Sequence, residues 1–216
     1  MMPTQLGNLI SLSQLCALSS ATHHPLASRP APVFHLPDTR FLPPSAHLFA
    51  PRRSLNGNSI DGTMPTQLGR ISRIADLYLH DSSISGTIPL QLLDSTFLLG
   101  DLRISAMRLS GTMPTQFGQL TNLWAAHLDG NRLSGTIPAQ IGTLPNLRSC
   151  FLSANRLSGS MPTQLGLLTH VGTNLILDGN RLDGTMPTQL GLLTGTEVTP
   201  THLLLQDNFL TGTPAT

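Results

Sequence analysis

The chain has 216 residues, of which 11% are charged, and its formal net charge is +1. This balance excludes a strong electrostatic preference for nucleic acid or for a membrane surface. All twelve basic residues are arginine, and the absence of lysine excludes the phosphate-binding P-loop, the kinase lysine and Schiff-base catalysis. The only glutamate is Glu197, which excludes paired-glutamate acid–base sites, and the length suffices for one sizeable core.

The first predicted element, residues 1–20, is a partial copy of a repeated unit. The letters MPTQLG at Met2–Gly7 recur at Met64–Gly69 and at Met161–Gly166. The leucine spacing of the later units continues after the first copy, at Leu9, Leu12 and Leu15. Self-similarity at a fixed period indicates a repeat architecture before any local propensity is considered.

The sequence does not assign a cellular compartment. The apolar stretch 9–21 has no basic segment before it, which a secretory signal requires. No Asn-x-Ser/Thr glycosylation site occurs, and no apolar run reaches the ~18 residues of a membrane-spanning helix. Two cysteines, Cys16 and Cys150, are too few for a disulfide framework, and we expect Cys150 to be a small buried apolar side chain.

The second predicted element, residues 21–51, interrupts the repeat. It contains seven prolines and four histidines and shows no strand-like alternation. Because proline removes a backbone donor and stops helices, the segment is predicted to be a loop or a disordered insert. An artefact of the gene model explains it equally well, since the repeat resumes intact afterwards. The histidines lack the spacing of metal ligands, so no metal site is expected.

The third predicted element, residues 52–216, is a solenoid of about seven coils. One position after each strand is usually asparagine and recurs every 24 to 28 residues, at Asn58, Ser82, Met107, Asn131, Asn155, Asn180 and Asn208. The extra residues of the longer units precede the strands, because an insertion within a strand would turn its side chains to the other face. Segments 94–99, 169–173 and 194–201 are therefore predicted to be connecting loops.

The clearest stretch of the repeat is 129–159, DGNRLSGTIPAQIGTLPNLRSCFLSANRLSG. It follows the pattern LxxLxxLxLxxNxLxGxIP, which resembles the plant-type leucine-rich repeat of receptor-like kinase ectodomains, receptor-like proteins and polygalacturonase inhibitors. The resemblance covers about three quarters of the chain. It implies an α/β repeat solenoid, a right-handed superhelix with a parallel β-sheet on the concave side and mostly loop or 3₁₀ structure on the convex side.

Each unit has a short strand whose side chains alternate between the core and the surface. The predicted inward pairs are Leu77 and Leu79, Leu102 and Ile104, Ala126 and Leu128, Cys150 and Leu152, Leu175 and Leu177, and Leu203 and Leu205. The asparagine after the strand can bond backbone groups of its own turn and of the adjacent coil. Ser82 can do part of this and Met107 none of it, so the coil of Met107 is predicted to be the loosest.

The candidate binding residues are the outward side chains of these strands, together with one tryptophan beside them. They are Tyr78, Arg103, Trp124, His127, Phe151, Ile176 and Leu204. Aromatic side chains gathered on an exposed face resemble an interface hot spot. The alternative is that they are strand-favouring residues without a partner, since scattered apolar surface residues are normal.

Two further rows repeat along the chain. An arginine follows the asparagine position at Arg108, Arg132, Arg156 and Arg181, with a predicted spacing of ~5 Å. Such a row could grip carboxylate or phosphate groups, although a solvated edge with Asp129, Asp178 and Asp183 as counter-charges is the favoured interpretation. A hydroxyl row is predicted on the opposite face, at Thr63, Thr87, Thr112, Thr136, Ser160 and Thr185.

We therefore expect a non-catalytic module that binds a protein or peptide through its concave face, without a cofactor or a nucleic-acid partner. It would be part of a receptor-like or inhibitor-like recognition protein. The alternative is a structural or water-ordering solenoid that uses the threonine row. No capping unit is visible at either end of the array, so self-association through the ends is also an expectation.

Overall fold

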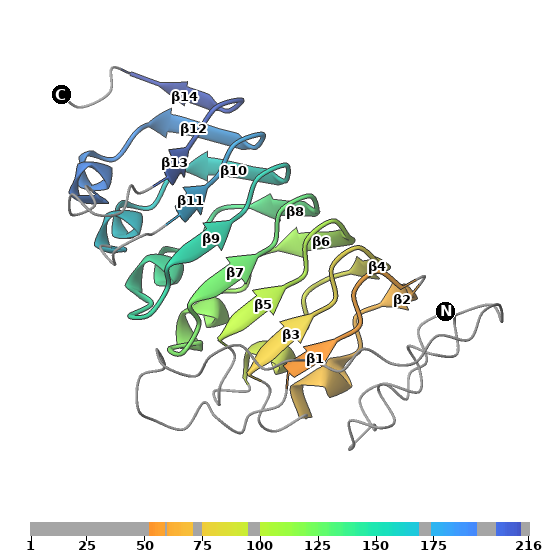
Figure 1. The fold of residues 1–216 in the computed structure, drawn as a ribbon. Helices are drawn as coiled ribbons and strands as arrows, with labels where there is room; N and C mark the ends of the chain where they lie inside the picture. The colour runs from red at the N-terminus through yellow and green to blue at the C-terminus, as the bar shows by residue number, and fades with distance from the viewer. Residues whose placement is uncertain are drawn as a thin grey trace, which may run out of the picture.

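The computed structural model describes residues 52–58, 60–70, 75–94, 100–168, 174–193 and 202–212. Within these ranges, successive coils of the chain stack side by side into a solenoid (Figure 1). The predicted partial unit 1–20 and the proline-rich insert 21–51 lie outside the described residues. The repeat-solenoid fold predicted for the later part of the chain is confirmed.

One side of the solenoid is a parallel sheet of seven short strands, called the first sheet here. Its order is β1-β3-β5-β7-β9-β11-β13, so each strand pairs with the strands of the adjacent coils. Equivalent residues lie directly opposite one another, for example Leu77 opposite Leu102. The strands are β1 (Arg52–Ser54), β3 (Asp76–Tyr78), β5 (Asp101–Arg103), β7 (Ala125–His127), β9 (Ser149–Phe151), β11 (Asn174–Ile176) and β13 (His202–Leu204).

The core is a continuous column of apolar side chains behind this sheet. The predicted inward residues from Leu77 to Leu177 are all buried. Only the last pair, Leu203 and Leu205, is partly exposed, yet both pack against the core. Cys150 lies in the column as predicted, and burial raises the pKa of its thiol to about 12. Each buried leucine contributes roughly 1.5–3 kcal/mol, which only stacking makes available.

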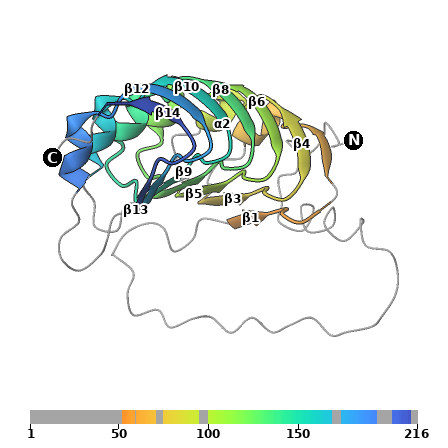
Figure 2. The same ribbon diagram turned by 90° about the horizontal axis from the view of Figure 1, so that it is seen from above.

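A second parallel sheet, which the sequence did not predict, lies across the core from the first (Figure 2). Serine hydroxyls link its strands, since Ser85 donates to the carbonyl of Gly62 and Ser110 to that of Gly86. Its strands are β2 (Asp61–Thr63), β4 (Ser83–Gly86), β6 (Arg108–Thr112), β8 (Arg132–Gly135), β10 (Arg156–Ser160), β12 (Arg181–Thr185) and β14 (Phe209–Thr211).

The register of the second sheet is offset by two residues per coil. Arg156 lies opposite Ser134, which is two residues beyond Arg132 in the preceding coil. A strand separation of ~4.8 Å combined with an offset of two residues places equivalent residues about 8 Å apart. The predicted spacing of ~5 Å for the arginine row is therefore wrong, because that value requires equivalent residues to lie directly opposite.

Short helical segments complete the coils, as predicted. In the described part of the chain, five are 3₁₀ helices and one is a single α-helical turn, each placed after a proline. Glycine lets neighbouring segments touch, since a Cβ built on Gly142 would lie 2.2 Å from the carbonyl oxygen of Gln164. The segments are η3 (Thr66–Arg70), α2 (Leu90–Leu93), η4 (Thr115–Gln119), η5 (Ala139–Thr143), η6 (Thr163–Leu167) and η7 (Thr188–Leu193). Among the described residues, no helical segment has the length and apolar character needed to cross a membrane.

A ladder of buried asparagines joins the later coils, as predicted. The side-chain amide of Asn155 donates to the carbonyls of Leu128 and Leu152, at 3.0 and 3.1 Å, and its oxygen accepts from the backbone N–H of Leu133 at 3.0 Å. Asn131, Asn180 and Asn208 make the same set of contacts.

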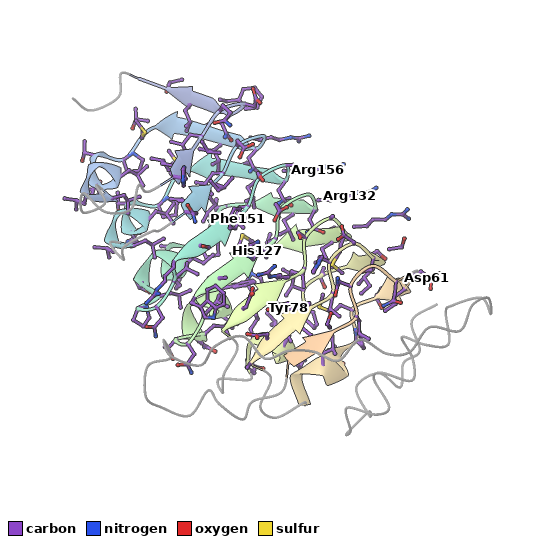
Figure 3. All side chains as sticks on the ribbon, viewed as in Figure 1. Asp61, Tyr78, His127, Arg132, Phe151 and Arg156 are labelled. Atoms are coloured by element: carbon purple, nitrogen blue, oxygen red, sulfur yellow. The ribbon has the colours of Figure 1, made fainter. Side chains whose placement is uncertain are left out.

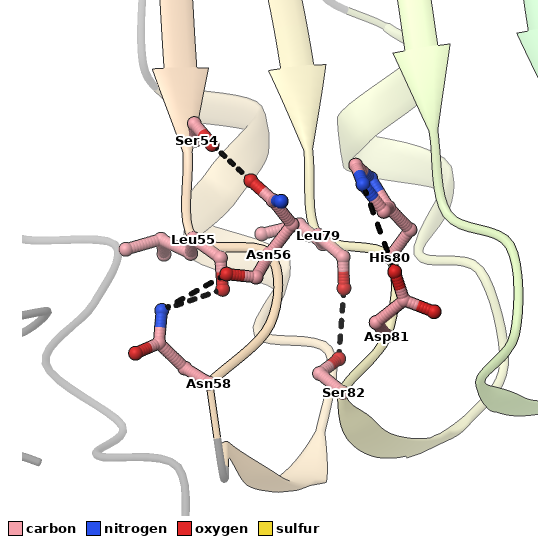
Figure 4. Close-up of polar contacts among 8 residues, drawn as sticks. All are labelled: Ser54, Leu55, Asn56, Asn58, Leu79, His80, Asp81 and Ser82. Atoms are coloured by element: carbon pink, nitrogen blue, oxygen red, sulfur yellow. Dashed lines mark hydrogen bonds and ion pairs between the residues drawn. The ribbon is translucent and has the colours of Figure 1, made fainter.

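The ladder is incomplete in the earlier coils. The hydroxyl of Ser82 donates to the carbonyl of Leu79 within its own turn, as Asn58 does to Leu55 (Figure 4). The side chain of Met107 occupies the next position and is buried. A thioether is at most a weak hydrogen-bond acceptor, so this coil lacks the amide contacts of its neighbours.

Candidate ligand-binding surface

Six of the seven predicted binding residues form one row across the first sheet. Each is the last residue of its strand, and the sheet register places them opposite one another in sequence. The row, called the central row below, consists of Tyr78, Arg103, His127, Phe151, Ile176 and Leu204. Figure 3 shows the side chains of Tyr78, His127 and Phe151 on the face of this sheet. The row therefore crosses six adjacent coils on a rigid backbone.

A buried carboxylate organises the first part of the row. Asp101 is fully buried, and its Oδ2 accepts a hydrogen bond of 3.0 Å from the Tyr78 hydroxyl. The same oxygen accepts from Nε of Arg103 at 3.0 Å and lies 2.9 Å from its Nη2. The guanidinium carbon of Arg103 lies 4.9 Å from the centroid of the Tyr78 ring, a cation–π arrangement. These contacts hold an otherwise flexible arginine in one position.

This cluster shifts the pKa values of its members. Burial, followed by the charge of Asp101, raises the pKa of Tyr78 to about 12. The hydrogen bond to Asp101 raises the pKa of Arg103 above its ordinary value. The side chain of Arg103 is 40% exposed, so its remaining N–H groups face solvent on the sheet surface. The cluster therefore presents a guanidinium held in place by its ion pair with Asp101, beside a neutral tyrosine.

Three buried polar atoms lack a hydrogen-bond partner within the described residues. They are Oδ1 of Asp101, Nδ1 of His80 and Oδ1 of Asp178. All three belong to residues that alternate with the inward side chains of the first sheet and so lie on its outer side. Buried polar atoms are nearly always paired in native proteins, so these atoms, which belong to three different coils, mark this side as one that a ligand could complete.

The middle of the row is aromatic. The rings of His127 and Phe151 are stacked, with centroids 4.5 Å apart and an angle of 10° between their planes. Burial is the main cause that lowers the pKa of His127 below its ordinary value, and the charge of Arg103 lowers it further. The neutral imidazole therefore forms one continuous flat surface with the phenyl ring.

Trp124, the seventh predicted binding residue, is not part of the central row. It directly precedes β7 and its side chain is 44% exposed. The indole packs over Gly100 of the preceding coil, where an added Cβ would lie 3.0 Å from Nε1. Glycine at this position leaves room for the indole, and part of the ring remains exposed.

The last part of the row is aliphatic. Ile176 is partly buried and Leu204 is 39% exposed. The surface therefore changes along the solenoid from charged and polar at Tyr78 and Arg103, through aromatic, to aliphatic at Leu204. A ligand that fits it must carry groups of matching character in the same order.

Asp101 is the residue that sequence reasoning missed. Its signal is the triplet Asp101-Leu102-Arg103, because residues two apart on a strand point to the same side and an acidic and a basic side chain there can pair. A metal site is the other kind of chemistry to consider. Within the described ranges, no group of three or more His, Cys, Asp or Glu side chains could hold a metal ion.

Comparison with solved structures places this geometry among known proteins. No protein-family model matches the sequence, and no curated protein sequence matches it. The leucine-rich repeat ectodomain of the Arabidopsis thaliana receptor kinase GASSHO1/SCHENGEN3, in complex with CASPARIAN STRIP INTEGRITY FACTOR 2, is 31% identical with a TM-score of 0.67. The match covers 73% of this chain and 18% of that one.

Two further structures extend the comparison. The ectodomain of the Arabidopsis receptor kinase HAESA, in complex with an extended IDA peptide hormone, is 31% identical with a TM-score of 0.66, covering 73% of this chain and 26% of that one. The BIR2 ectodomain from Arabidopsis thaliana is 32% identical with a TM-score of 0.53, covering 62% of this chain and 68% of that one. The present chain thus spans about a quarter or less of the length of the GASSHO1/SCHENGEN3 and HAESA ectodomains.

Proposed function

The chain belongs to the plant-type leucine-rich repeat proteins, and from this premise we propose that it is a non-catalytic module that binds a protein or peptide ligand across the first sheet. The central row would form the contact surface, with Trp124 at its edge. The role would be recognition, of the kind that receptor-like or inhibitor-like proteins perform.

The observation that carries this proposal is the position of Arg103. Asp101 and Tyr78 hold its guanidinium in place before any ligand arrives, and the stacked His127 and Phe151 lie in the next two coils. Pre-organised side chains lose little conformational entropy on binding, which is a main determinant of affinity. An extended peptide that crosses the strands would meet a cation, an aromatic surface and an aliphatic surface in turn.

The similar proteins support this proposal by what they bind. The GASSHO1/SCHENGEN3 and HAESA ectodomains were both solved with a peptide ligand or factor in place. A rigid array of parallel strands gives such ligands an extended surface in which each coil contributes one set of side chains.

Selection of peptides on the full chain tests the proposal. Peptides isolated from a random display library are measured against Trp124→Ala with Phe151→Ala, and against the control Leu167→Ala with Thr136→Ala, whose side chains are exposed away from the first sheet. We expect the first pair to weaken binding at least tenfold, since aromatic anchors dominate interfaces, and the control pair to change it less than twofold. Equal effects of the two pairs would refute the proposal.

One observation favours a second candidate, a water-ordering surface on the hydroxyl row. A Cβ built on Gly111 would lie 2.9 Å from Cγ2 of Thr87, and one on Gly135 would lie at the same distance from that of Thr112. Each threonine methyl thus rests on the glycine of the next coil, which fixes a regular array of hydroxyls. Thermal hysteresis that is lost in Thr87→Tyr with Thr136→Tyr would support this function, and its absence from the unaltered protein would dismiss it.

A further inference from the structure

Four arginines begin four consecutive strands of the second sheet. They form the arginine row, which consists of Arg108 in β6, Arg132 in β8, Arg156 in β10 and Arg181 in β12. All four are exposed. Figure 3 shows the side chains of Arg132 and Arg156 projecting away from the body of the solenoid. The row lies at the turn that follows the first sheet, on a different side of the coils from the central row.

The arginine row has no acidic partner among the described residues. The ion pairs in this part of the chain join Arg103 to Asp101 and His80 to Asp81, and neither involves the row. The sequence-based interpretation of a solvated edge with Asp129, Asp178 and Asp183 as counter-charges stays a prediction, because it does not require direct ion pairs. The adjacent positions are mostly serine, and Ser110 and Ser134 use their hydroxyls to bond glycine carbonyls of the preceding coil.

Acidic residues border the row at both ends, and one more, Asp183, lies beside Arg181 in β12. Two residues before each arginine, the turn has a residue with a positive φ, and in these four coils that residue is small. The four are Ala106, Gly130, Ala154 and Gly179. In the flanking coils the same turn position is Asp81 or Asp207. The positive surface is thus limited to four coils and to a length of about 24 Å at the spacing of the second sheet.

We propose that the arginine row binds an extended acidic peptide segment in which every second residue carries a carboxylate. Side chains on one side of an extended peptide repeat every ~6.6 Å, which arginines about 8 Å apart can meet by leaning toward one another. The guanidinium group pairs with carboxylates through two parallel hydrogen bonds. The ends at Asp81 and Asp207 limit the segment to about four acidic side chains. This site is separate from the central row, and a protein partner could contact both.

An octapeptide of alternating aspartate and serine tests the proposal on the full chain. At low ionic strength we expect it to bind several-fold more tightly than a peptide of the same composition with its aspartates in one block, because only the alternating spacing suits the row. Replacing Arg132 and Arg156 by Gln should weaken binding of the alternating peptide about tenfold. The control Arg148→Gln, which removes a single exposed arginine outside the row, should change it less than twofold, and Arg156→Gln alone, which removes the same charge, should weaken it about threefold.

Two further variants and a competing ligand test where the peptide binds and which chemistry the site selects. Asp183 lies two residues after Arg181 where the other three strands have serine, so Asp183→Ser should strengthen binding about twofold. Phe151→Ala should leave it unchanged, which separates this site from the proposed function of the central row. The proposal is overturned if Arg148→Gln weakens binding as much as the row variant, or if the block peptide binds equally well. It is also overturned if a short single-stranded oligonucleotide binds more tightly than the alternating peptide.

Discussion

Behind the first sheet, the hydrogen bonds between coils differ between two regions. The later region contains the coils of Asn131 to Asn208, and the earlier region contains the coils of Ser82 and Met107. From Asn131 to Asn208, each asparagine bonds its own turn and the preceding coil. At Ser82 and Met107, these links between coils are reduced or missing. The leucine column continues through both regions, so apolar burial suffices to stack coils and the asparagines add satisfied backbone groups to that stack.

The coils of the earlier region are joined instead by side chains on the outer side of the first sheet. Tyr78 belongs to the coil of Ser82, and Asp101 with Arg103 belongs to the coil of Met107. The hydrogen bond from Tyr78 to Asp101 therefore joins the two coils whose ladder positions are weakest. The same cluster presents Arg103 to a ligand, so one group of side chains serves both stacking and recognition.

Breaking the ladder in the later region should have the largest effect. Asn155→Leu leaves the buried N–H of Leu133 without an acceptor, which costs about 1–3 kcal/mol. The carbonyls of Leu128 and Leu152 each lose one of two amide donors and keep Asn131 and Asn180. We expect the free energy of unfolding to fall by about 3 kcal/mol in a urea titration. Asn208→Leu, at a partly exposed position, should cost clearly less, and an equal or larger loss there would contradict this account.

Removing the contacts of Asp101 on the outer side of the first sheet should have the second-largest effect on stability. Asp101→Ala removes the bonds to Tyr78 and Arg103, and we expect a loss of about 2 kcal/mol, typical of hydrogen bonds to a charged group. In the same background, Met107→Asn should restore about 1 kcal/mol, because by analogy with Asn131 its amide would reach the carbonyl of Leu79.

The double variant separates stacking from recognition. It should regain stability in the urea titration. The peptides selected on the unaltered chain should still bind weakly, because the carboxylate that positions Arg103 is still absent. Recovery of binding together with stability would show that Asp101 acts on the fold alone and not through the position of Arg103.

Much of this comparison could be predicted from the sequence. The asparagine and leucine spacing gave the coils, the inward residues and the central row, and Ser82 and Met107 stood out as weak positions. The second sheet could not be predicted, because serine and glycine have low strand propensity and its strands form by pairing between coils. The role of Asp101 also depends on register, since its partner Tyr78 lies 23 residues away.

A smaller effect comes from the left-handed turn before each ladder position. Ala106 and Ala154 both have a φ of 52°, a conformation that disfavours residues with a Cβ, whereas Gly130 and Gly179 occupy the same turn without strain. Ala106→Gly and Ala154→Gly should each raise the free energy of unfolding by up to about 1 kcal/mol. Equal gains would show that the two regions hold the turn equally firmly. A gain at Ala154 alone would show that the backbone in the coil of Met107 has already relieved the strain at Ala106.

The smallest effect should appear as a pH dependence at the centre of the first sheet. Burial lowers the pKa of His127 below its ordinary value of 6.5, so the unfolded chain takes up a proton there before the folded chain does. The contribution of His127 to stability is therefore complete above pH 6.5, falls as the pH decreases and is lost below the lowered pKa of the folded state. Urea titrations of the unaltered chain and of His127→Gln should diverge in that window, with the unaltered chain losing more stability in acid. Parallel curves would mean that the stacked imidazole takes up its proton as freely in the folded state as in the unfolded chain.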